Sequence, residues 1–401
     1  MTLDAERVRR SFPILARLIS GRKLVYFDNA ATSLTPDEVI DAELAFYRCV
    51  RANVHRGRHA LSEEASSAFE EARAEIARFI GASAGEVVFT AGTTTGLNMV
   101  ADGLDLPPDA EILTMMGDHH STILPWRKRW QVRTLETSPL RPLDPDLLRR
   151  ALSKRTKAVV LSHASNVTGL VQPLHDLCHI AGEHGLVTVI DAAQSAPHLP
   201  LNVRDLGCDF LAFSGHKMLG PTGVGVLYGR RRALECLTPR DLGGGVVERV
   251  TLSERELRPV PARFEAGTPN IAGVLGLAAA VRYIETIGWG AITEHAQLLA
   301  HILRSMLSEV RGVRLLAAEG KTLPIVSLSV PEAGVRLEDL SAALSDRYGI
   351  MTRSGLMCAQ PLFHALRWPE GALRISAYIY NTVQEVEWLC ASLGELLTTF
   401  A

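Results

Sequence analysis

Residues 209–228 read DFLAFSGHKMLGPTGVGVLY. The rest of the chain is organised around this stretch, in which two apolar segments enclose a turn with one lysine. The first segment, Phe210 to Phe213, is typical of a buried strand, and a glycine-rich turn holding Lys217 follows it. A charge between two buried strands is costly unless it is paired or neutral. One neutral form is an imine with an aldehyde cofactor, in which lysine acts as a covalent catalyst. The alternative is a lysine at a strand end that only reaches out to water.

The composition of the 401-residue chain indicates one large domain with a smaller one beside it, because 47% of the residues are hydrophobic and 21% are charged. The formal net charge is −2, and no basic block stands apart from acidic residues, so we expect no binding to nucleic acid or to an anionic membrane. No apolar run of about 18 residues is present, which argues against a transmembrane helix. Residues 1–10 are polar and predict no secretory signal, so a cytoplasmic location is expected.

The cysteine positions indicate no metal site, whereas two histidines leave several interpretations open. The six cysteines are widely scattered without a C-x-x-C pair, which is neither a zinc pattern nor a disulfide framework. Two adjacent histidines, His119 and His120, leave three interpretations open: metal ligands, a polar surface turn, or an imidazole stacked on a flat aromatic cofactor.

Strands alternate with helices in the first two thirds of the chain. The expected strands span residues 86–90, 111–115, 157–162, 186–190 and 210–213. Several of them end in polar residues, such as Asn166 and Asp191. This pattern predicts a doubly wound α/β domain with a mostly parallel sheet and a ligand crevice at the carboxyl ends of its strands.

A turn of small residues, 91–96, follows the first of these strands and opens a helix. Free backbone N–H groups and the positive end of the helix dipole meet there, which suits a phosphate. The turn matches neither the dinucleotide fingerprint nor the P-loop. Plain helix capping is the alternative.

The pattern changes after Tyr228. Residues 246–260 predict a hairpin, and the mixed helices and strands beyond residue 291 predict a second, smaller α+β domain. We place the hinge near residues 284–290. The large domain would then span residues 23–285, and the small domain residues 1–22 and 286–401. A loop of the small domain carries Cys358 with Arg353 close before it.

A lysine, a phosphate-binding turn, an aspartate at a strand end and a histidine that can stack are what a pyridoxal 5′-phosphate (PLP) site needs. Over nearly its whole length the chain resembles the fold-type I, class V aminotransferase-like enzymes, and among them the group II (SufS-like) cysteine desulfurases and selenocysteine lyases. The motifs that carry this resemblance, in order, are residues 54–57, 92–94, 118–120, 163–166, 191–194, 214–217, 264–270 and 353–355, with Cys358 and Arg374.

The resemblance implies a role for each motif residue. Lys217 attaches the cofactor and moves protons, Asp191 holds the ring nitrogen, Gln194 the ring hydroxyl, and His119 stacks on the ring. Cys358 accepts the sulfur. The residues implied to hold the phosphate are Thr93, Thr94, Ser214, His216 and, from the neighbouring subunit of a homodimer, Thr268. The residues implied to bind or flank the substrate are Asn166, Arg374 and Arg353.

The implied reaction converts L-cysteine to L-alanine and leaves a persulfide on Cys358, from which a sulfur-acceptor protein takes the sulfur, for instance for iron–sulfur cluster assembly. L-selenocysteine is a second candidate substrate. Leu356 and Met357 depart from the pair of histidines usual in the family. Two alternatives stay open. One is another class V PLP enzyme, such as an epimerase or lyase, in which Cys358 is incidental. The other is a non-enzymatic scaffold that binds a sulfur-carrier partner.

Overall fold

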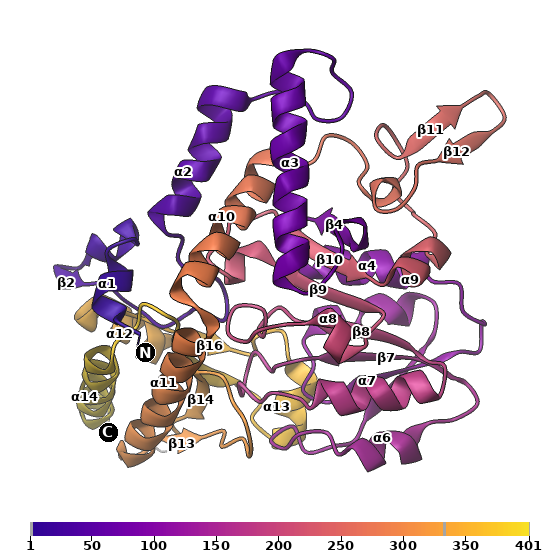
Figure 1. The fold of residues 1–401 in the computed structure, drawn as a ribbon. Helices are drawn as coiled ribbons and strands as arrows, with labels where there is room; N and C mark the ends of the chain where they lie inside the picture. Colours follow the sequence, from indigo (N-terminus) through magenta and orange to yellow (C-terminus); the bar gives the residue numbers. More distant parts are fainter. Residues whose placement is uncertain (1–2, 332–333, 401) are drawn as a thin grey trace.

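The computed structural model describes residues 3–331 and 334–400, and its largest element is a seven-stranded sheet (Figure 1). The strand order is β4-β10-β9-β8-β7-β5-β6. Only β10 runs antiparallel to its neighbours, β4 and β9, while the remaining pairs are parallel. The strands are β4 (Val87–Thr90), β5 (Glu111–Met115), β6 (Gln131–Leu135), β7 (Thr156–Ser162), β8 (Val187–Asp191), β9 (Phe210–Ser214) and β10 (Gly225–Gly229).

Apolar side chains cover both faces of this sheet. In β9, Leu211 and Phe213 belong to one apolar cluster, whereas Phe210 and Ala212 belong to another on the opposite face. The first cluster includes residues of α3 (Ala60–Phe79), α7 (Leu174–Glu183) and α10 (Ile271–Ile287), and the second includes residues of α4 (Thr93–Gly103). The predicted mostly parallel sheet with helices on both faces is therefore confirmed.

The C-terminal part is the α+β unit that the sequence predicts. Its antiparallel sheet has the order β13-β14-β17-β16. A separate apolar cluster packs the sheet against three helices. The strands are β13 (Arg314–Leu315), β14 (Ile325–Ser329), β16 (Arg353–Gly355) and β17 (Ala372–Ser376), and the helices are α11 (Trp289–Glu309), α12 (Leu337–Tyr348) and α14 (Val383–Phe400).

The chain bends sharply where α10 gives way to α11. Gly288 lies between them with φ 87°, and the two helices differ in direction by 82°. This break falls inside the predicted hinge, although the domain boundaries themselves remain a prediction. Near the N-terminus, β3 (Val25–Tyr26) pairs in parallel with β15 (Ile350–Met351), and Val25 and Phe27 pack in the C-terminal cluster.

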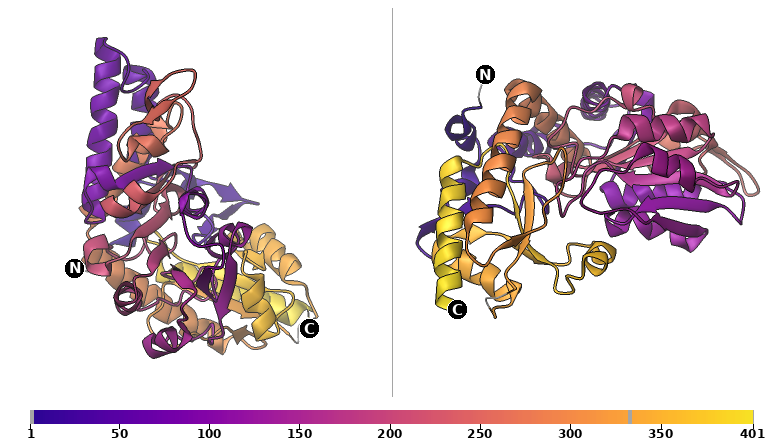
Figure 2. Two further views of the ribbon diagram at one scale, coloured as in Figure 1. Left: turned by 90° about the vertical axis from the view of Figure 1, so that its right-hand side faces the viewer. Right: turned by 90° about the horizontal axis from the view of Figure 1, so that it is seen from below.

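The N-terminal helix α1 (Ala5–Arg9) joins the C-terminal part through an ion pair between Arg9 and Glu385 at 2.6 Å. In the right-hand view of Figure 2, α1 and α14 lie on the side of the molecule away from the seven-stranded sheet. Across the described residues, no single helix is long and apolar enough to cross a membrane; only α10 and α11 taken together, as a bent pair, reach that length and composition.

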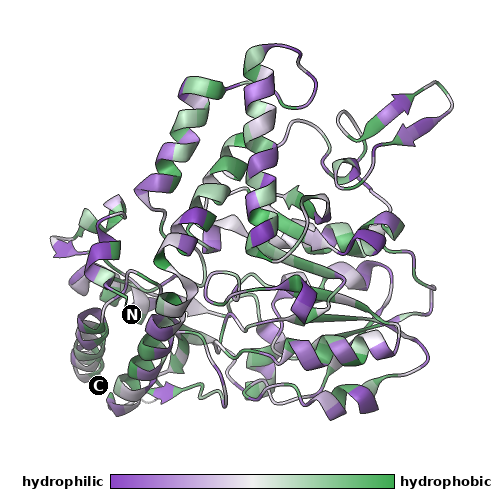
Figure 3. Ribbon diagram, viewed as in Figure 1, coloured by the Kyte–Doolittle hydropathy of each residue, from purple (hydrophilic) through white to green (hydrophobic). Residues whose placement is uncertain are grey.

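The predicted hairpin is confirmed as β11 (Val247–Val250) and β12 (Arg255–Leu257). It projects away from the seven-stranded sheet, and its strands are largely hydrophilic (Figures 1 and 3). Leu252 at its tip is fully exposed. The hairpin therefore adds nothing to the core of the described chain.

Candidate active site

A cavity of about 220 Å³ lies at the carboxyl ends of β7, β8 and β9, where the sequence predicts a ligand crevice. Nine residues predicted to hold the cofactor or substrate line it: Thr93, Thr94, His119, Asn166, Asp191, Gln194, Ser214, His216 and Lys217. They come from five separate segments of the chain. The fold thus brings together in one place most of the residues that the sequence marked.

Lys217 lies in a short 3-10 turn, Gly215–Lys217, directly after β9. The backbone N–H of Gly215 donates to the carbonyl of Val224 at 2.9 Å, which ties the turn to the segment leading into β10. Burial lowers the pKa of the lysine amine to about 8, against the opposing effect of the carboxylate of Asp191. A fraction of this amine is therefore neutral near neutral pH and able to react with a carbonyl.

Asp191, at the end of β8, is buried and oriented by two hydrogen bonds. Thr122 Oγ1 donates to one carboxylate oxygen at 3.0 Å, and the N–H of Ala193 donates to the other at 2.9 Å. These two hydrogen bonds leave the other lone pairs of the carboxylate free to accept a hydrogen bond from a protonated ring nitrogen. The strand end therefore presents a held carboxylate to the cavity.

A second buried carboxylate, Asp118, lies behind this site and was not assigned a role from sequence. It accepts from the N–H of Met115 at 2.7 Å and from the N–H of Ser162 at 3.0 Å. Burial raises its pKa to about 7, and the charge of Asp191 adds to the shift. The sequence marked residues 118–120 as a family motif but gave Asp118 no role, because its burial depends on the tertiary structure.

The turn of small residues opens a helix as predicted, because α4 begins at Thr93; its binding of a phosphate stays a prediction. Ser214 Oγ accepts from the N–H of Thr93 at 2.8 Å and lies 2.7 Å from the Thr93 hydroxyl. The hydroxyls of Thr94 and Ser121 are 2.8 Å apart. Four cavity-lining hydroxyls thus gather at the start of an eleven-residue helix, an arrangement that suits an anion.

The two cavity histidines are neutral at physiological pH. Burial lowers the pKa of His119 and of His216 to about 4, and the charge of Lys217 acts in the same direction on both. His119 Nδ1 accepts from the N–H of Ser121 at 3.1 Å, which places its proton on Nε2. A neutral imidazole fixed in this way suits stacking on a flat ring, and among the described residues no cluster suits a metal ion.

Cys358 is exposed and lies on the loop after β16, outside the set of residues that line the cavity. Met357 and Cys358 have φ angles of 45° and 54°, in the left-handed region that costs a non-glycine residue about 1–3 kcal/mol. Two hydrogen bonds hold this conformation. Asn166 Nδ2 donates to the carbonyl of Met357 at 2.8 Å, and the N–H of His120 donates to the carbonyl of Cys358 at 2.9 Å.

Arg374 is buried in β17 and contacts both Asn166 and Asp28. One of its terminal nitrogens donates to the main-chain carbonyl of Asn166 at 3.0 Å, and the other donates to Asp28 Oδ1 at 2.9 Å. Its Nε has no partner within the described residues. Arg353, by contrast, is largely exposed, and its guanidinium lies 3.9 Å from Asp28 Oδ2.

Thr268 does not lie with the other predicted cofactor residues. It lines a separate cavity of about 480 Å³ together with Asn53, Arg56, Arg258 and other residues. The resemblance assigned Thr268 to the site of a neighbouring subunit, and that assignment stays a prediction.

The cavity residues fit PLP, because they would offer complementary groups to its aldehyde, ring nitrogen, ring face and phosphate. Lys217 offers an amine to the aldehyde, Asp191 a carboxylate to the ring nitrogen, and His119 a neutral ring to stack on. The turn at Thr93 offers hydroxyls and a helix start to the phosphate. Little free space lies beside Gly92, because a β-carbon added there would lie 3.1 Å from Ser214 Oγ.

The fold and the cavity define a fold-type I α/β enzyme with a lysine at the carboxyl edge of its sheet. The chain belongs to the aminotransferase class-V family, because the sequence model of that family matches residues 25–389.

Among proteins of known name, the chain is similar over its full length to cysteine desulfurases. The chain is 39% identical over 402 residues to a probable cysteine desulfurase of Halalkalibacterium halodurans, covering 98% of this chain and 97% of that protein. It is 40% identical over 407 residues to a cysteine desulfurase of Serratia proteamaculans, covering 99% of each. The apo structure of a cysteine desulfurase from Thermococcus onnurineus NA1 superimposes with a TM-score of 0.93 at 40% identity, over 100% of this chain and 99% of that one.

Proposed function

We propose that this protein is a PLP-dependent cysteine desulfurase that converts L-cysteine to L-alanine and transfers the sulfur to Cys358. One observation carries the proposal. Lys217 and Asp191 share a cavity with Asn166, and the side chain of Asn166 holds the loop that presents Cys358. The full-length similarity to cysteine desulfurases supports the same function.

PLP, when bound, supplies an aldehyde that captures amines and a ring that withdraws electrons from the substrate Cα. The residues of this chain supply the rest. Asp191, oriented by Thr122, keeps a proton on the ring nitrogen. Lys217, with a pKa lowered to about 8 by burial, takes and returns a proton near neutral pH.

Recognition of the substrate carboxylate falls to Arg374 and Asn166. The guanidinium of Arg374 is buried and has a donor, Nε, without a partner within the described residues. Asn166 Nδ2 carries two protons, of which the bond to Met357 uses one. Charge-assisted hydrogen bonds from these groups would fix the amino acid with its side chain toward the cysteine loop.

The sulfur step uses the thiolate of Cys358 as the nucleophile. Its Sγ attacks the sulfur of the bound cysteine, forming an S–S bond as the Cβ–S bond breaks. The electron pair of the broken bond passes to carbon, which is protonated to give alanine. One cysteine and one enzyme thiol thus become one alanine and one persulfide, and atoms and electrons balance without an external oxidant.

We further propose the group II subtype and a homodimer with shared active sites. The short span from Arg353 to Cys358 supports the subtype. The position of Thr268 beside Arg56, in a cavity apart from Lys217, supports the dimer, because it leaves this threonine available to another subunit. Analytical ultracentrifugation of the purified protein tests the dimer directly.

The exposed thiol of Cys358 supports transfer of the persulfide sulfur to a dedicated acceptor protein, with iron–sulfur cluster assembly as one destination. A cytoplasmic location and activity on L-selenocysteine belong to the same proposal. Replacing cysteine with selenocysteine in the assay and comparing kcat/KM tests the second of these.

Single-turnover mass spectrometry after addition of cysteine, with alanine assayed alongside, tests the main proposal. We expect a mass gain of one sulfur on Cys358, matched by one alanine. Cys358→Ala should abolish both, whereas Cys49→Ala, which removes another exposed thiol, should change neither. Alanine without a persulfide on Cys358 would refute its role as acceptor. No alanine at all from the PLP-loaded protein would favour a different class V reaction.

A further inference from the structure

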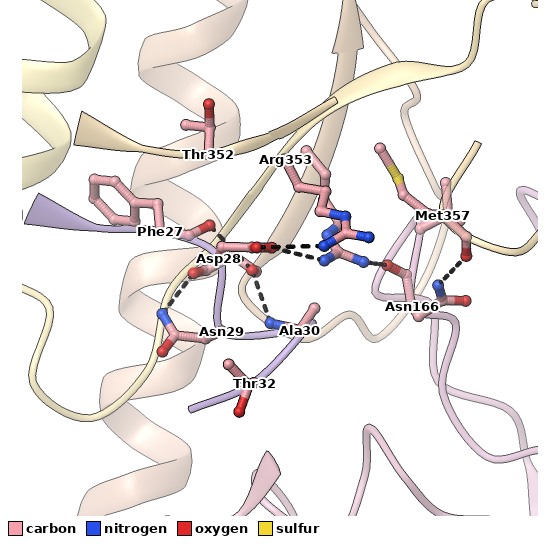
Figure 4. A network of polar contacts seen from close by, with 12 residues as sticks. Phe27, Asp28, Asn29, Ala30, Thr32, Asn166, Thr352, Arg353 and Met357 are labelled. Carbon is pink, nitrogen blue, oxygen red and sulfur yellow. Dashed lines mark hydrogen bonds and ion pairs between the residues drawn. The ribbon is translucent and has the colours of Figure 1, made fainter. Parts of the chain in front are cut away.

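Asp28 is a residue of the active-site region to which neither the sequence motifs nor the family resemblance assigns a role. It follows β3 and forms an isolated parallel bridge with Ser376, next to the strand that carries Arg374. Its carboxylate is largely buried and contacts Arg374 at 2.9 Å and Arg353 at 3.9 Å (Figure 4). One carboxylate thus serves two guanidinium groups.

These two arginines lie directly opposite each other in the sheet, because Arg353 of β16 is the register partner of Arg374 of β17. Side chains directly opposite in an antiparallel pair project from the same face, and like charges there repel. Arg374 is also buried, so a solvent shell does not screen its charge. Asp28 provides the negative charge that lets Arg374 stay in its observed orientation.

A chain of hydrogen bonds continues from Asp28 to the nucleophile. Asp28 Oδ1 accepts from Arg374, Arg374 donates to the carbonyl of Asn166, and Asn166 Nδ2 donates to the carbonyl of Met357. Met357 immediately precedes Cys358, and both have left-handed backbone conformations that need external support. Four segments far apart in the sequence therefore meet along a single line of contacts.

We propose that Asp28 is a positioning residue: it holds Arg374, and through Arg374 and Asn166 it also holds the loop of Cys358. The groups that would bind the substrate carboxylate and the loop that carries the thiol therefore depend on the same contacts. A substrate carboxylate that bonds to Arg374 and Asn166 is thereby linked to the placement of the thiol that attacks the substrate sulfur. This inference rests on the proposed function for its substrate, while the linkage itself concerns only the residues described above.

Charge balance gives the expected consequences of substitution. Asp28→Ala leaves two facing guanidinium groups uncompensated, so Arg374 shifts and releases Asn166. Asp28→Asn keeps an oxygen that can accept from Arg374 but lacks the charge, so its effect is smaller. The matched control is Asp339→Asn on α12, which removes the carboxylate of an exposed ion pair with Arg336.

Kinetics with L-cysteine give the first readout. Because a charge-assisted hydrogen bond is worth about a tenfold change in equilibrium, we expect KM to rise about tenfold in Asp28→Ala and about threefold in Asp28→Asn, with smaller changes in kcat. Asp339→Asn should match the wild type. A purely structural role for Asp28 would lower the thermal midpoint and leave KM unchanged.

Hydrogen exchange of the PLP-loaded protein gives the second readout, with and without saturating L-alanine, which has the carboxylate but no sulfur. In both Asp28 variants, exchange in residues 353–359 should rise about threefold or more relative to the wild type, with little change in the seven-stranded sheet. L-alanine should protect this segment in the wild type and protect it less in Asp28→Ala.

Wild-type exchange and wild-type KM in the Asp28 variants would overturn the inference. Should Asp28→Ala fail to fold, the same two measurements on Asp28→Asn decide the matter. The exchange experiment needs no turnover, so a wild-type protein that makes no alanine from cysteine would refute the proposed function while leaving the linkage measurable.

Discussion

Gly225 of β10 packs directly against the backbone of Gly92, and a β-carbon at residue 225 would lie 2.5 Å from Gly92 Cα. It would also lie 2.7 Å from the carbonyl oxygen of Phe213. Both distances are too short for any side chain, and both neighbours are backbone. The turn that is to hold the phosphate therefore owes its position to a glycine on the neighbouring antiparallel strand.

Gly225→Ala should consequently displace the phosphate-binding turn. We expect a loss of stability of about 1–3 kcal/mol from overpacking and a weaker affinity for PLP. Gly243→Ala is the matched control, because no heavy atom lies within 4 Å of the position its β-carbon would take. Urea unfolding and equilibrium titration with PLP measure the two effects. Equal PLP affinities in the two variants would contradict this account of the turn.

The lowered pKa of Lys217 predicts a pH dependence for cofactor loading. Only the neutral amine attacks an aldehyde, so the rate of PLP attachment to the apo protein should rise with pH and level off above about pH 8. A free lysine analogue should keep rising toward pH 10. Stopped-flow absorbance between pH 6.5 and 9.5, a range that brackets the value of about 8, follows the reaction. A protein rate still climbing at the upper limit would show that burial does not depress this pKa.

Asp118 predicts an unusual stability profile for the apo protein. Its folded-state pKa of about 7 exceeds the unfolded value of 3.8, so its stabilising effect is fully present below pH 3.8 and is lost as the pH rises through 7. Relative to Asp118→Asn, the wild type should lose about 2–3 kcal/mol of unfolding free energy between about pH 5 and pH 8. Urea unfolding of both proteins at each pH isolates this group, since the other titrating residues are shared. A pH-independent difference would mean that Asp118 stays ionised throughout.

A buried ion pair supports the face of the sheet near α3. Arg73 donates to both carboxylate oxygens of Glu265, at 2.7 and 2.9 Å, and the N–H of Phe89 donates to the same carboxylate at 2.8 Å. Glu265→Ala leaves the strand N–H of Phe89 without its partner and leaves the buried guanidinium with only the half-exposed Glu70 and the carbonyl of Val87. We therefore expect a loss of about 2–3 kcal/mol of unfolding free energy.

The control for this substitution is Glu319→Ala, which breaks an exposed pair with Arg141 and should cost less than about 1 kcal/mol. Chemical denaturation of both variants at low and high salt gives the comparison. Similar losses in the two variants would show that burial does not strengthen the pair of Arg73 and Glu265.

The strands of the parallel sheet could be predicted from sequence because they are buried on both faces and so appear as continuous apolar runs. The predicted strand 111–115 coincides with β5, and 157–162 differs from β7 by one residue. By contrast, β6 at the sheet edge was not predicted. Four of its five residues are exposed or half-buried, so it lacks the apolar signal of a buried strand.

The sequence by itself determined which residues follow which strands, and parallel strands bring such residues to one edge of the sheet. The order of a lysine, an aspartate and a glycine-rich turn resembles that of PLP enzymes, and this resemblance implies the role of each residue. Tertiary structure alone decided the partnership of Asp28 with Arg374, which are 346 residues apart, and the hold of Asn166 on Met357, 191 residues away. Such contacts depend on how two separately packed units meet, and no local pattern of residues records the energy of that packing.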